Sequence, residues 1–464
     1  MSPRCSSVAE IVVLGAGPAG LMAALDLATA GHRCVLLEAQ GRPGGMSASI
    51  EVAGQRVDLG SHRLHPATSR ELLAEIGEWL GDDLQTRERN GRIHLSGRWI
   101  GFPLRATDMI RNLPPAFAVR AMVDSLTGPL RRGAERSFDD AIRRRLGPAV
   151  ASDFYAPYAA KLYGVEPGAL SVELADRRVS AGGPIDIARR VLRASRPEGR
   201  TFLYPRDGYG QIVDRLTERV VAAGVDLRLA SPASAITPSG DRFRVSTASG
   251  DVEVDLALSS IPPAALARIV DDVPTEVATA MSQVRTRAMV LVYLVVDLDR
   301  YTPFDAHYIP DASRSIARLS EPKNYRDGDD PPGQTVLCAE IPCWVGDDVW
   351  NANDVALGQL VADDLRQLGL PEPPVLDVAS ERLPSVYPVL ERSTEAARTA
   401  VSTWVDGLDG IVSFGRQGLA VPDNLHHVLT MGRSVARAVR EDGSFDRDRW
   451  AESLLAFETH VVED

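Results

Sequence analysis

Residues 11–20 read Ile11-Val12-Val13-Leu14-Gly15-Ala16-Gly17-Pro18-Ala19-Gly20, an apolar run followed by glycines in the spacing Gly-x-Gly-x-x-Gly. The apolar run predicts a buried strand. The alanine- and leucine-rich residues from Pro18 to about Ala30 predict a helix that Gly31 ends. A second apolar run, Cys34-Val35-Leu36-Leu37, follows directly. The order strand, helix, strand predicts a βαβ unit in a parallel sheet that is buried on both faces.

Each glycine of this turn meets a separate steric need of a nucleotide site. Gly15 permits the tight turn, Gly17 leaves room for a pyrophosphate against the backbone, and Gly20 lets helix and strand pack closely. The start of the helix offers free N–H groups and a positive dipole end to phosphates. Glu38 ends the second strand, where a carboxylate accepts hydrogen bonds from a ribose hydroxyl. The stretch therefore predicts a dinucleotide site.

The residues after Glu38 bear on which dinucleotide is bound. They read Ala39-Gln40-Gly41-Arg42-Pro43-Gly44-Gly45-Met46. This segment resembles the glycine-rich extension of flavoproteins in the glutathione-reductase-like class with two dinucleotide-binding domains, and simple NAD dehydrogenases lack it. The resemblance implies that the cofactor is FAD, with the arginine and the paired glycines close to it.

The remaining chain alternates between strand-like and helix-like patterns. Apolar runs predict strands near residues 225–236, 255–262, 289–296 and 410–414, and residues 243–254 predict a hairpin. Residues 76–200 are arginine-rich and helix-like, with prolines that break the pattern, and further helices are predicted at residues 357–369 and 424–440. We found no internal repeat.

These patterns predict an α/β fold in which two kinds of domain are interleaved. We expect a Rossmann-type FAD-binding domain formed by residues 8–75, 200–270 and 405–445. An α+β substrate domain is expected from residues 76–199 and 271–404, which would supply the substrate-binding and helical lobes.

Several later motifs extend the resemblance. Residues 57–65, Val57 to His65, resemble the loop beside the isoalloxazine ring in UDP-galactopyranose mutases and the matching loop of protoporphyrinogen-oxidase-like proteins. Residues 98–104 are similar to the "FPL" segment of these proteins, and residues 154–164 to their "YxxKxWG" segment, with Tyr163 where Trp is usual. Residues 202–210 are similar to their "YPxxGxG" segment, and residues 414–418 to their last FAD-binding segment. From about residue 10 to 440, the chain resembles the amine-oxidase-like flavoprotein superfamily. Its members include amine oxidases, protoporphyrinogen oxidases, carotenoid desaturases and UDP-galactopyranose mutases.

The turn and the resemblance together give a set of expected cofactor contacts. The last helix, from Asn424 through Gly432, would point its N-terminus at the flavin. The expected FAD-binding residues are Gly15, Gly17, Pro18, Ala19, Gly20, Glu38, Ala39, Arg42, Gly44, Gly45, Met46, Gly60, Ser61, His62, Ala233, Gly415, Arg416, His427 and Val428.

His62 and Arg63 are the expected catalytic residues, because the loop resemblance places them beside the flavin ring. Arg63 would stabilise negative charge on the reduced flavin. His62 would hydrogen-bond the ring or move a proton, since an imidazole titrates near neutrality. The alternative interpretation is that both residues only anchor their loop.

Five further side chains are singled out with less specific roles. Lys161 is expected to hold a domain junction through an ion pair, and the alternative is that it takes part in the reaction. Arg416 is expected beside the pyrophosphate or the ring edge, and Tyr387 either walls the substrate cavity or packs as a strand aromatic. Of the neighbouring His426 and His427, one is expected to face the flavin and the other solvent.

Composition excludes several other classes of protein. The formal net charge of −12 argues against a nucleic-acid partner. Cys5, Cys34, Cys338 and Cys343 show no metal or disulfide spacing, so no metal site is expected. No run approaches the roughly 18 apolar residues of a membrane span, and the N-terminus does not resemble a signal peptide. A cytoplasmic location is therefore the expectation.

The leading hypothesis is an FAD-dependent oxidoreductase that moves a hydride from a C–N, C–O or C–C bond of a small molecule to flavin N5. One alternative is a redox-neutral nucleotide-sugar mutase in which reduced flavin is the nucleophile, so the candidate substrates include sugars and nucleotide-sugars. A second alternative is a non-catalytic FAD-binding protein. The family resemblance does not decide between these three functions. The sequence does not determine the oligomeric state.

Overall fold

A five-stranded parallel sheet forms around the glycine-rich stretch in a computed structural model that describes residues 8–65, 68–104, 106–128, 131, 133–178 and 201–462. Its order is β19-β13-β1-β2-β9, with every neighbouring pair parallel. The strands are β1 (Glu10–Leu14), β2 (Arg33–Leu37), β9 (Asp226–Arg228), β13 (Leu256–Ser259) and β19 (Ile411–Ser413). Cys5 and the part of the expected helical lobe from residue 179 to 199 lie outside the described residues.

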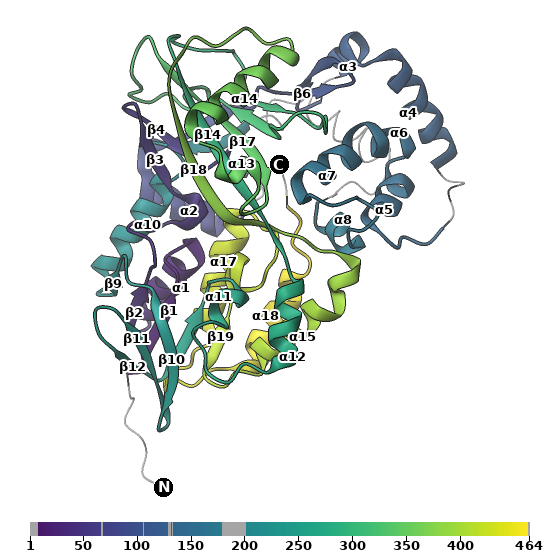
Figure 1. The fold of residues 1–464 in the computed structure, drawn as a ribbon. Coiled ribbons are helices and arrows are strands. Elements are labelled where there is room, and N and C mark those ends of the chain that lie inside the picture. Colours follow the sequence, from purple (N-terminus) through teal and green to yellow (C-terminus); the bar gives the residue numbers. More distant parts are fainter. Residues whose placement is uncertain are drawn as a thin grey trace.

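Both faces of this sheet are covered, which explains why β1 is apolar throughout. Ile11 and Val13 pack into a cluster with α1 (Pro18–Thr29) and α17 (Leu425–Arg437), whereas Val12 and Leu14 pack against a three-stranded antiparallel sheet. This second sheet consists of β10 (Ala233–Ser239), β11 (Arg242–Thr247) and β12 (Val252–Val254). Alternate residues of a strand point to opposite faces, so each layer receives every second side chain. Figure 1 shows α1 and α17 side by side, below the seven-stranded sheet that is described next.

A seven-stranded sheet lies above the parallel one (Figure 1). Its order is β18-β14-β17-β16-β15-β6-β7. On β14, Val290, Val292 and Leu294 pack toward α14, and the intervening Leu291 and Tyr293 pack toward Val57 and Leu59. The strands and helix are β6 (Gly91–Leu95), β7 (Arg98–Phe102), β14 (Thr286–Val296), β15 (Ala306–Tyr308), β16 (Arg318–Ser320), β17 (Thr335–Cys343), β18 (Val375–Pro388) and α14 (Asp354–Gln367).

A helical lobe projects from one side of the two sheets (Figure 1). Its inward faces share a core that includes Phe138, Leu162 and Leu174. The lobe consists of α3 (Ala106–Asn112), α4 (Pro115–Thr127), α5 (Phe138–Arg145), α6 (Pro148–Val150), the π-helical turn η4 (Ala151–Tyr155), α7 (Ala156–Tyr163) and α8 (Val172–Arg178).

The remaining elements connect these layers. β3 (Ser49–Val52) pairs with β4 (Gln55–Asp58), and β5 (Leu84–Glu88) pairs with β8 (Thr201–Pro205). The other helices are η1 (Gly45–Ser47), α2 (Arg70–Leu80), η2 (Gly81–Asp83), α10 (Gln211–Ala222), α11 (Pro263–Leu266), α12 (Thr275–Gln283), η6 (Pro322–Asn324), α13 (Asp348–Asn351), η7 (Arg392–Thr394), α15 (Glu395–Asp406), α16 (Gly415–Gly418) and α18 (Arg447–Phe457).

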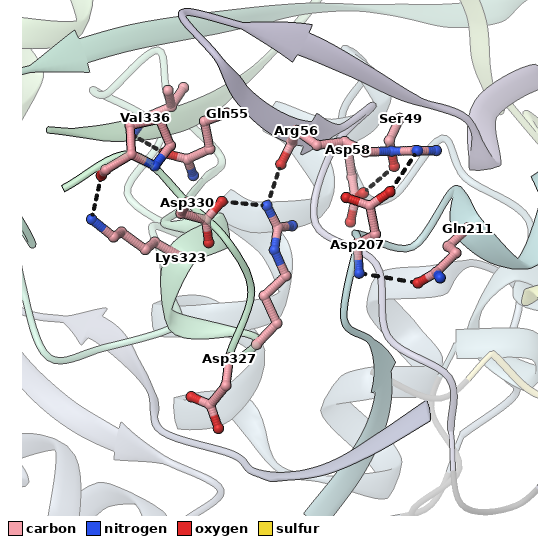
Figure 2. A network of polar contacts seen from close by, with 12 residues as sticks. Ser49, Gln55, Arg56, Asp58, Asp207, Gln211, Lys323, Asp327, Asp330 and Val336 are labelled. Carbon is pink, nitrogen blue, oxygen red and sulfur yellow. Dashed lines mark hydrogen bonds and ion pairs between the residues drawn. The ribbon is translucent and has the colours of Figure 1, made fainter. Parts of the chain in front are cut away.

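A network of polar side chains fastens β4 to segments from distant parts of the chain (Figure 2). The buried Asp58 carboxylate accepts from Ser49 Oγ at 2.6 Å, from the Tyr204 hydroxyl and from Tyr209 N–H at 3.0 Å. Beside it, the Arg326 guanidinium donates to the Arg56 carbonyl at 2.7 Å. Because burial raises the pKa of Asp58, its ionised form depends on these donors. The network fixes the end of β4, where the loop of residues 59–63 begins.

The structure confirms the predicted α/β class with a parallel sheet around the Gly15 turn. Strands from the ranges 8–75, 200–270 and 405–445 share that sheet, while the division into domains stays a prediction. The expectation of a helix-rich segment at 76–200 missed β5, β6 and β7. β5 pairs with a strand more than one hundred residues away, so it had little local signal. β6 and β7 form a hairpin through the two-residue turn Ser96-Gly97, a local signal that the sequence analysis missed.

We expect the contact between α1 and α17 to limit the stability of the fold. A Cβ at Gly432 would lie 2.3 Å from the Ala19 carbonyl oxygen, so Gly432→Ala must push the two helices apart. We expect a loss of about 1–3 kcal/mol in the free energy of unfolding, measured by urea denaturation. The matched control is Gly77→Ala in α2, where an added Cβ meets nothing within 4 Å. This control should stabilise by about 0.5–1 kcal/mol. Equal effects at the two sites would contradict the steric argument.

Candidate functional site

The glycine-rich turn borders a cavity of about 470 Å³. Gly15 has a φ of +94° and donates its N–H to the Leu37 carbonyl at 2.8 Å, which closes the turn. A Cβ at Gly20 would lie 1.9 Å from the Gly15 carbonyl oxygen, whereas one at Gly17 would meet no protein atom within 4 Å. Gly20 is therefore required for packing. Gly17 faces the open cavity, which fits a phosphate group lying close to the backbone.

Glu38 connects the turn to the end of β2. Its two carboxylate oxygens accept from the N–H groups of Ala16 and Gln40, each at 2.8 Å. The side chain is buried, with 9% of its surface exposed, and borders the cavity. A carboxylate accepts up to about four hydrogen bonds, so Glu38 retains capacity for a ribose hydroxyl.

The loop from Leu59 to Arg63 forms a second wall of the cavity. Ser61 N–H donates to Glu340 Oε1 on β17 at 2.8 Å, and the Ser61 hydroxyl lies 2.5 Å from the Tyr325 hydroxyl. Glu340 also accepts two hydrogen bonds from Arg318, each 2.8 Å long. One carboxylate thus holds the loop backbone and a buried guanidinium together.

His62 is buried in this loop and its ring stacks on Tyr209, with centroids 5.2 Å apart. Its Nδ1 is buried and has no hydrogen-bond partner among the residues that the structure describes. Burial, followed by the nearby charges of Arg318 and Arg416, lowers the pKa of His62 to about 3. The expected titration near neutrality is therefore wrong for this environment, because a buried imidazole beside two cations stays neutral.

Arg63 lies against aromatic rings and is paired with a carboxylate. It donates to Asp305 Oδ1 at 3.1 Å and to the hydroxyls of Tyr308 and Tyr325 at 3.2 Å. Its guanidinium carbon also lies 4.9 Å from the centroid of the Tyr325 ring. Burial opposes its charge, but Tyr325 and Asp305 raise the pKa of Arg63, so it stays charged. Much of that charge is balanced by Asp305.

Arg416, in α16 directly before α17, also lines the cavity. It donates to the carbonyls of Asp423 and Val386 at 3.1 and 2.8 Å, and its buried Nε has no partner in the described part of the chain. Burial lowers the pKa of Arg416 from its ordinary value. A buried guanidinium with an unused donor fits an acceptor-rich or anionic ligand.

The helical lobe supplies the far wall of the cavity through Tyr158, Leu162 and Arg178. The guanidinium of Arg178 lies 5.2 Å from the centroid of Tyr387, which also borders the cavity. Lys161 turns away from this wall and donates to the carbonyls of Ile309 and Ile316 at 2.6 and 2.8 Å.

The ion pair expected for Lys161 is thus replaced, among the described residues, by two carbonyl contacts that tie α7 to the seven-stranded sheet. Burial lowers the pKa of the ammonium to about 7.

His427 lies behind the cavity wall in a cluster with Asp423 and His460. Asp423 Oδ1 is 3.3 Å from His427 Nδ1, and Asp423 Oδ2 is 3.2 Å from His460 Nδ1. Although burial raises it, hydrogen bonds from the two imidazoles lower the pKa of Asp423 below its usual value. The imidazole rings stack 4.0 Å apart with 12° between their planes, so their in-plane lone pairs do not converge well on one ion. This carboxylate joins the start of α17 to the segment after α18.

The cavity is positively charged although the chain as a whole is acidic. Among the described lining residues, seven are arginines and four are acidic, an excess of three positive charges. The arginines are Arg42, Arg63, Arg89, Arg178, Arg318, Arg382 and Arg416, and the acidic residues are Glu38, Glu340, Glu381 and Asp423. Such a surface favours anionic ligands.

The structure brings most of the expected site residues into this one cavity. Those lining it are Gly15, Gly17, Pro18, Ala19, Glu38, Arg42, Gly45, Met46, Gly60, Ser61, His62, Arg63, Arg416 and Val428. Gly20, Ala39, Gly44, Ala233, Gly415 and His427 are not among the lining residues. Gly44 donates its N–H to the Ala16 carbonyl, and a Cβ at Gly415 would lie 2.8 Å from the Ala19 Cβ. Both residues therefore contact the residues of the glycine-rich turn. Neither His426 nor His427 lines the cavity, contrary to the expectation for one of them.

Sequence reasoning missed several lining residues. Arg318, Glu340 and Arg178 lie in segments without a recognised motif, and only the sheet register brings the first two together. A buried charged pair on facing strands could have been suspected from polar residues within the apolar run of β17.

Comparisons with known proteins show the family of this chain. The family model described as flavin-containing amine oxidoreductase matches residues 18–408. A putrescine oxidase from Kocuria rosea is 44% identical over 82 residues, which cover 18% of this chain and 17% of that protein. A chloroplastic protoporphyrinogen oxidase from Oryza sativa subsp. japonica is 25% identical over 318 residues, or 61% of this chain and 58% of that protein. The chain therefore matches less than two thirds of the length of either curated relative.

A structural comparison extends the similarity to nearly the whole chain. The crystal structure of a reduced UDP-galactopyranose mutase matches 98% of this chain and 100% of its own, with a TM-score of 0.79 at 21% sequence identity. At this identity the match shows the fold.

No helix in the described part of the chain has the length and apolarity needed to span a bilayer.

The expected cofactor is confirmed: the protein is a flavoprotein that binds FAD. The open space at Gly17, the spare acceptor capacity of Glu38 and the unused donor of Arg416 all fit a dinucleotide in this cavity.

We expect Glu38→Ala to weaken FAD binding strongly. The change removes a ribose acceptor and also leaves the N–H groups of Ala16 and Gln40 without their carboxylate. A charge-assisted hydrogen bond contributes about 1.5–3 kcal/mol, so the Kd should rise on the order of tenfold or more. Fluorescence titration of the apoprotein with FAD measures this, and Glu51→Ala on the exposed side of β3 is the control. An unchanged Kd would remove Glu38 from the site.

The buried His62 should make the protein less stable in acid. The unfolded chain takes up a proton below about pH 6.5, but the native ring does so only near pH 3, so stability falls as the pH drops through that window. Between pH 7 and pH 5, the protonation of His62 in the unfolded chain should lower the free energy of unfolding by about 2 kcal/mol, and His62→Gln should abolish this loss. Urea denaturation of the FAD-bound protein at both pH values measures the difference. His65→Gln in the same loop is the control, and a parallel pH dependence in wild type and His62→Gln would refute the assignment.

Proposed function

We propose that this chain, which belongs to the flavin-containing amine oxidoreductase family, is an FAD-dependent oxidoreductase that oxidises a small molecule. Bound FAD supplies the hydride acceptor for such a reaction. The observation that carries the proposal is the extent of the cavity, which runs from the dinucleotide turn at Gly17 to the helical lobe at Tyr158 and Arg178. This extent supports the binding of a second molecule beyond the dinucleotide in the same cavity.

The charge of the cavity supports an anionic substrate. A cationic amine such as putrescine, the substrate named for one relative's solved complex, would meet an excess of arginines at this wall. Arg178 lines the cavity and carries a charge suited to a phosphate or carboxylate group, whereas the charge of Arg318 is balanced by Glu340. We therefore favour oxidation at a C–O or C–C bond of an anionic molecule over oxidation of an amine.

The loop of residues 59–63 would orient the reacting molecules. Its backbone is fixed by Glu340, so His62 and Arg63 present polar groups from a rigid position. The neutral His62 ring has an unused Nδ1 that can exchange a hydrogen bond with a ligand without a change in charge. Arg63 would add a positive potential that Asp305 attenuates.

A redox-neutral mutase acting on a nucleotide-sugar is the second candidate. The same excess of arginines supports it, because a nucleotide-sugar carries a diphosphate. The fold similarity to UDP-galactopyranose mutase is compatible with both candidates, since one fold hosts different chemistries.

Anaerobic mixing experiments separate these functions. Oxidised holoprotein mixed with a panel of anionic alcohols, carboxylates and porphyrin precursors should lose its flavin absorbance with one of them and regain it in air. A mutase would instead leave the absorbance unchanged and convert a nucleotide-sugar only after chemical reduction, as followed by chromatography. Bleaching by a polyamine and by no anion would overturn the proposed substrate charge. Full FAD occupancy with neither reaction would favour a binding protein.

A further inference from the structure

Residues 458–462, which follow α18, connect the region of the parallel sheet to the helical lobe. α18 packs beside the parallel sheet through the buried Trp450 and Phe457, in the same cluster as α1 and α17. Figure 1 shows α18 in this lower part of the molecule and α8 in the lobe. At the far end of the segment, the N–H of Val462 donates to the Arg177 carbonyl of α8 at 2.8 Å. We call residues 458–462 the strap.

The strap is fixed at one end by Asp423, which lies just before α17. The Asp423 side chain is fully buried, and its Oδ2 lies 3.2 Å from His460 Nδ1. The His460 ring also stacks on His427, with centroids 4.0 Å apart, and lies 5.3 Å from the Phe457 ring. Because a buried carboxylate is costly to leave without its donors, the contact between Asp423 and His460 holds the strap in place.

The other end of the strap lies where an arginine borders the cavity. Arg177, whose carbonyl accepts from Val462, is followed in the chain by Arg178, and both Arg178 and Val462 line the cavity. The beginning of α8 is held separately, because Glu173 accepts from Arg398 of α15 at 3.1 Å. The strap therefore holds the end of α8 that carries Arg178.

The strap is too short to allow the end of α8 to move far. His460 and Val462 are two residues apart, and two residues of fully extended chain span about 7 Å. While both contacts are made, the Arg177 carbonyl must stay close to Asp423, which also lines the cavity. Loss of either contact would release the end of α8 and, with it, the position of Arg178.

We propose that the strap positions Arg178 for an anionic ligand in the cavity. His460 is then a positioning residue, since it is not among the described lining residues and acts through Val462 and α8. The proposal rests on the anionic substrate class proposed above. The hold of the strap on α8 can be measured without any such ligand.

Hydrogen–deuterium exchange of the FAD-bound protein tests whether the strap holds α8. His460→Ala removes the donor to Asp423, so the amides of α8 and of the strap should exchange about three- to tenfold faster. His460→Asn keeps an N–H donor near the place of Nδ1 and should restore most of the protection. The amides of α1 should exchange as in wild type in both variants. Glu458→Ala, at an exposed position of the strap, is the matched control.

Calorimetric titration of the same holoproteins with inorganic pyrophosphate tests the position of Arg178. The Kd should rise about three- to tenfold in His460→Ala and in Val462→Pro, which lacks the N–H for Arg177. His460→Asn and Glu458→Ala should bind as wild type does.

Two results would overturn the proposal. One is unchanged exchange of α8 in both His460→Ala and Val462→Pro, and the other is faster exchange with an unchanged Kd. If wild type binds no pyrophosphate, the proposed substrate charge fails and the positioning role fails with it. In that case the exchange rates still report separately whether the strap holds α8.

Discussion

The buried Glu340 carboxylate is the contact on which the candidate site depends. It accepts the N–H of Ser61, 279 residues away in sequence, and at the same time both donors of the Arg318 fork. Removing one partner from a buried pair leaves an uncompensated charge, which costs several kcal/mol. The loop of residues 59–63 therefore cannot shift without disturbing β16 and β17. Gly60 contributes to this fit because its φ of +103° brings the loop close to Glu340.

The local part of the fold could be predicted from sequence, and the distant part could not. The turn from Gly15 to Gly20 and the strand before it are set by nearby residues, since a glycine spacing and an apolar run act within one βαβ unit. β13 and β19 lie within the apolar runs expected at residues 255–262 and 410–414, whereas the run expected at residues 225–236 is divided between β9 and β10. By contrast, β5 pairs with β8 across more than one hundred residues. Such a strand is stabilised by its partner, so its own sequence carries little signal.

The same distinction explains which site residues were found. Gly17, Glu38 and Arg416 belong to motifs whose roles follow from their immediate neighbours. The behaviour of His62 depends on charges from Arg318 and Arg416, which only the folded chain brings near, and these move its pKa far from that of a free imidazole. Lys161 was expected to form an ion pair, but the fold offers it two backbone carbonyls between β15 and β16. A motif predicts that a residue lies at a site, whereas the charge state of that residue depends on the neighbours that the folded chain brings to it.

Charge is distributed in this protein so that the cavity and the chain as a whole have opposite signs. The net negative charge of the chain would repel anions at long range, yet the residues that line the cavity include more arginines than acidic residues, which attracts anions locally. A bound dinucleotide diphosphate offsets part of this excess near Gly17. Arg178 and Arg318 also line the cavity, and the charge of Arg318 is balanced by Glu340. Because His62 stays neutral, it does not add to or cancel this potential as the pH varies near neutrality. The selection of a substrate by charge would therefore fall to the arginines, whose charge is constant at physiological pH.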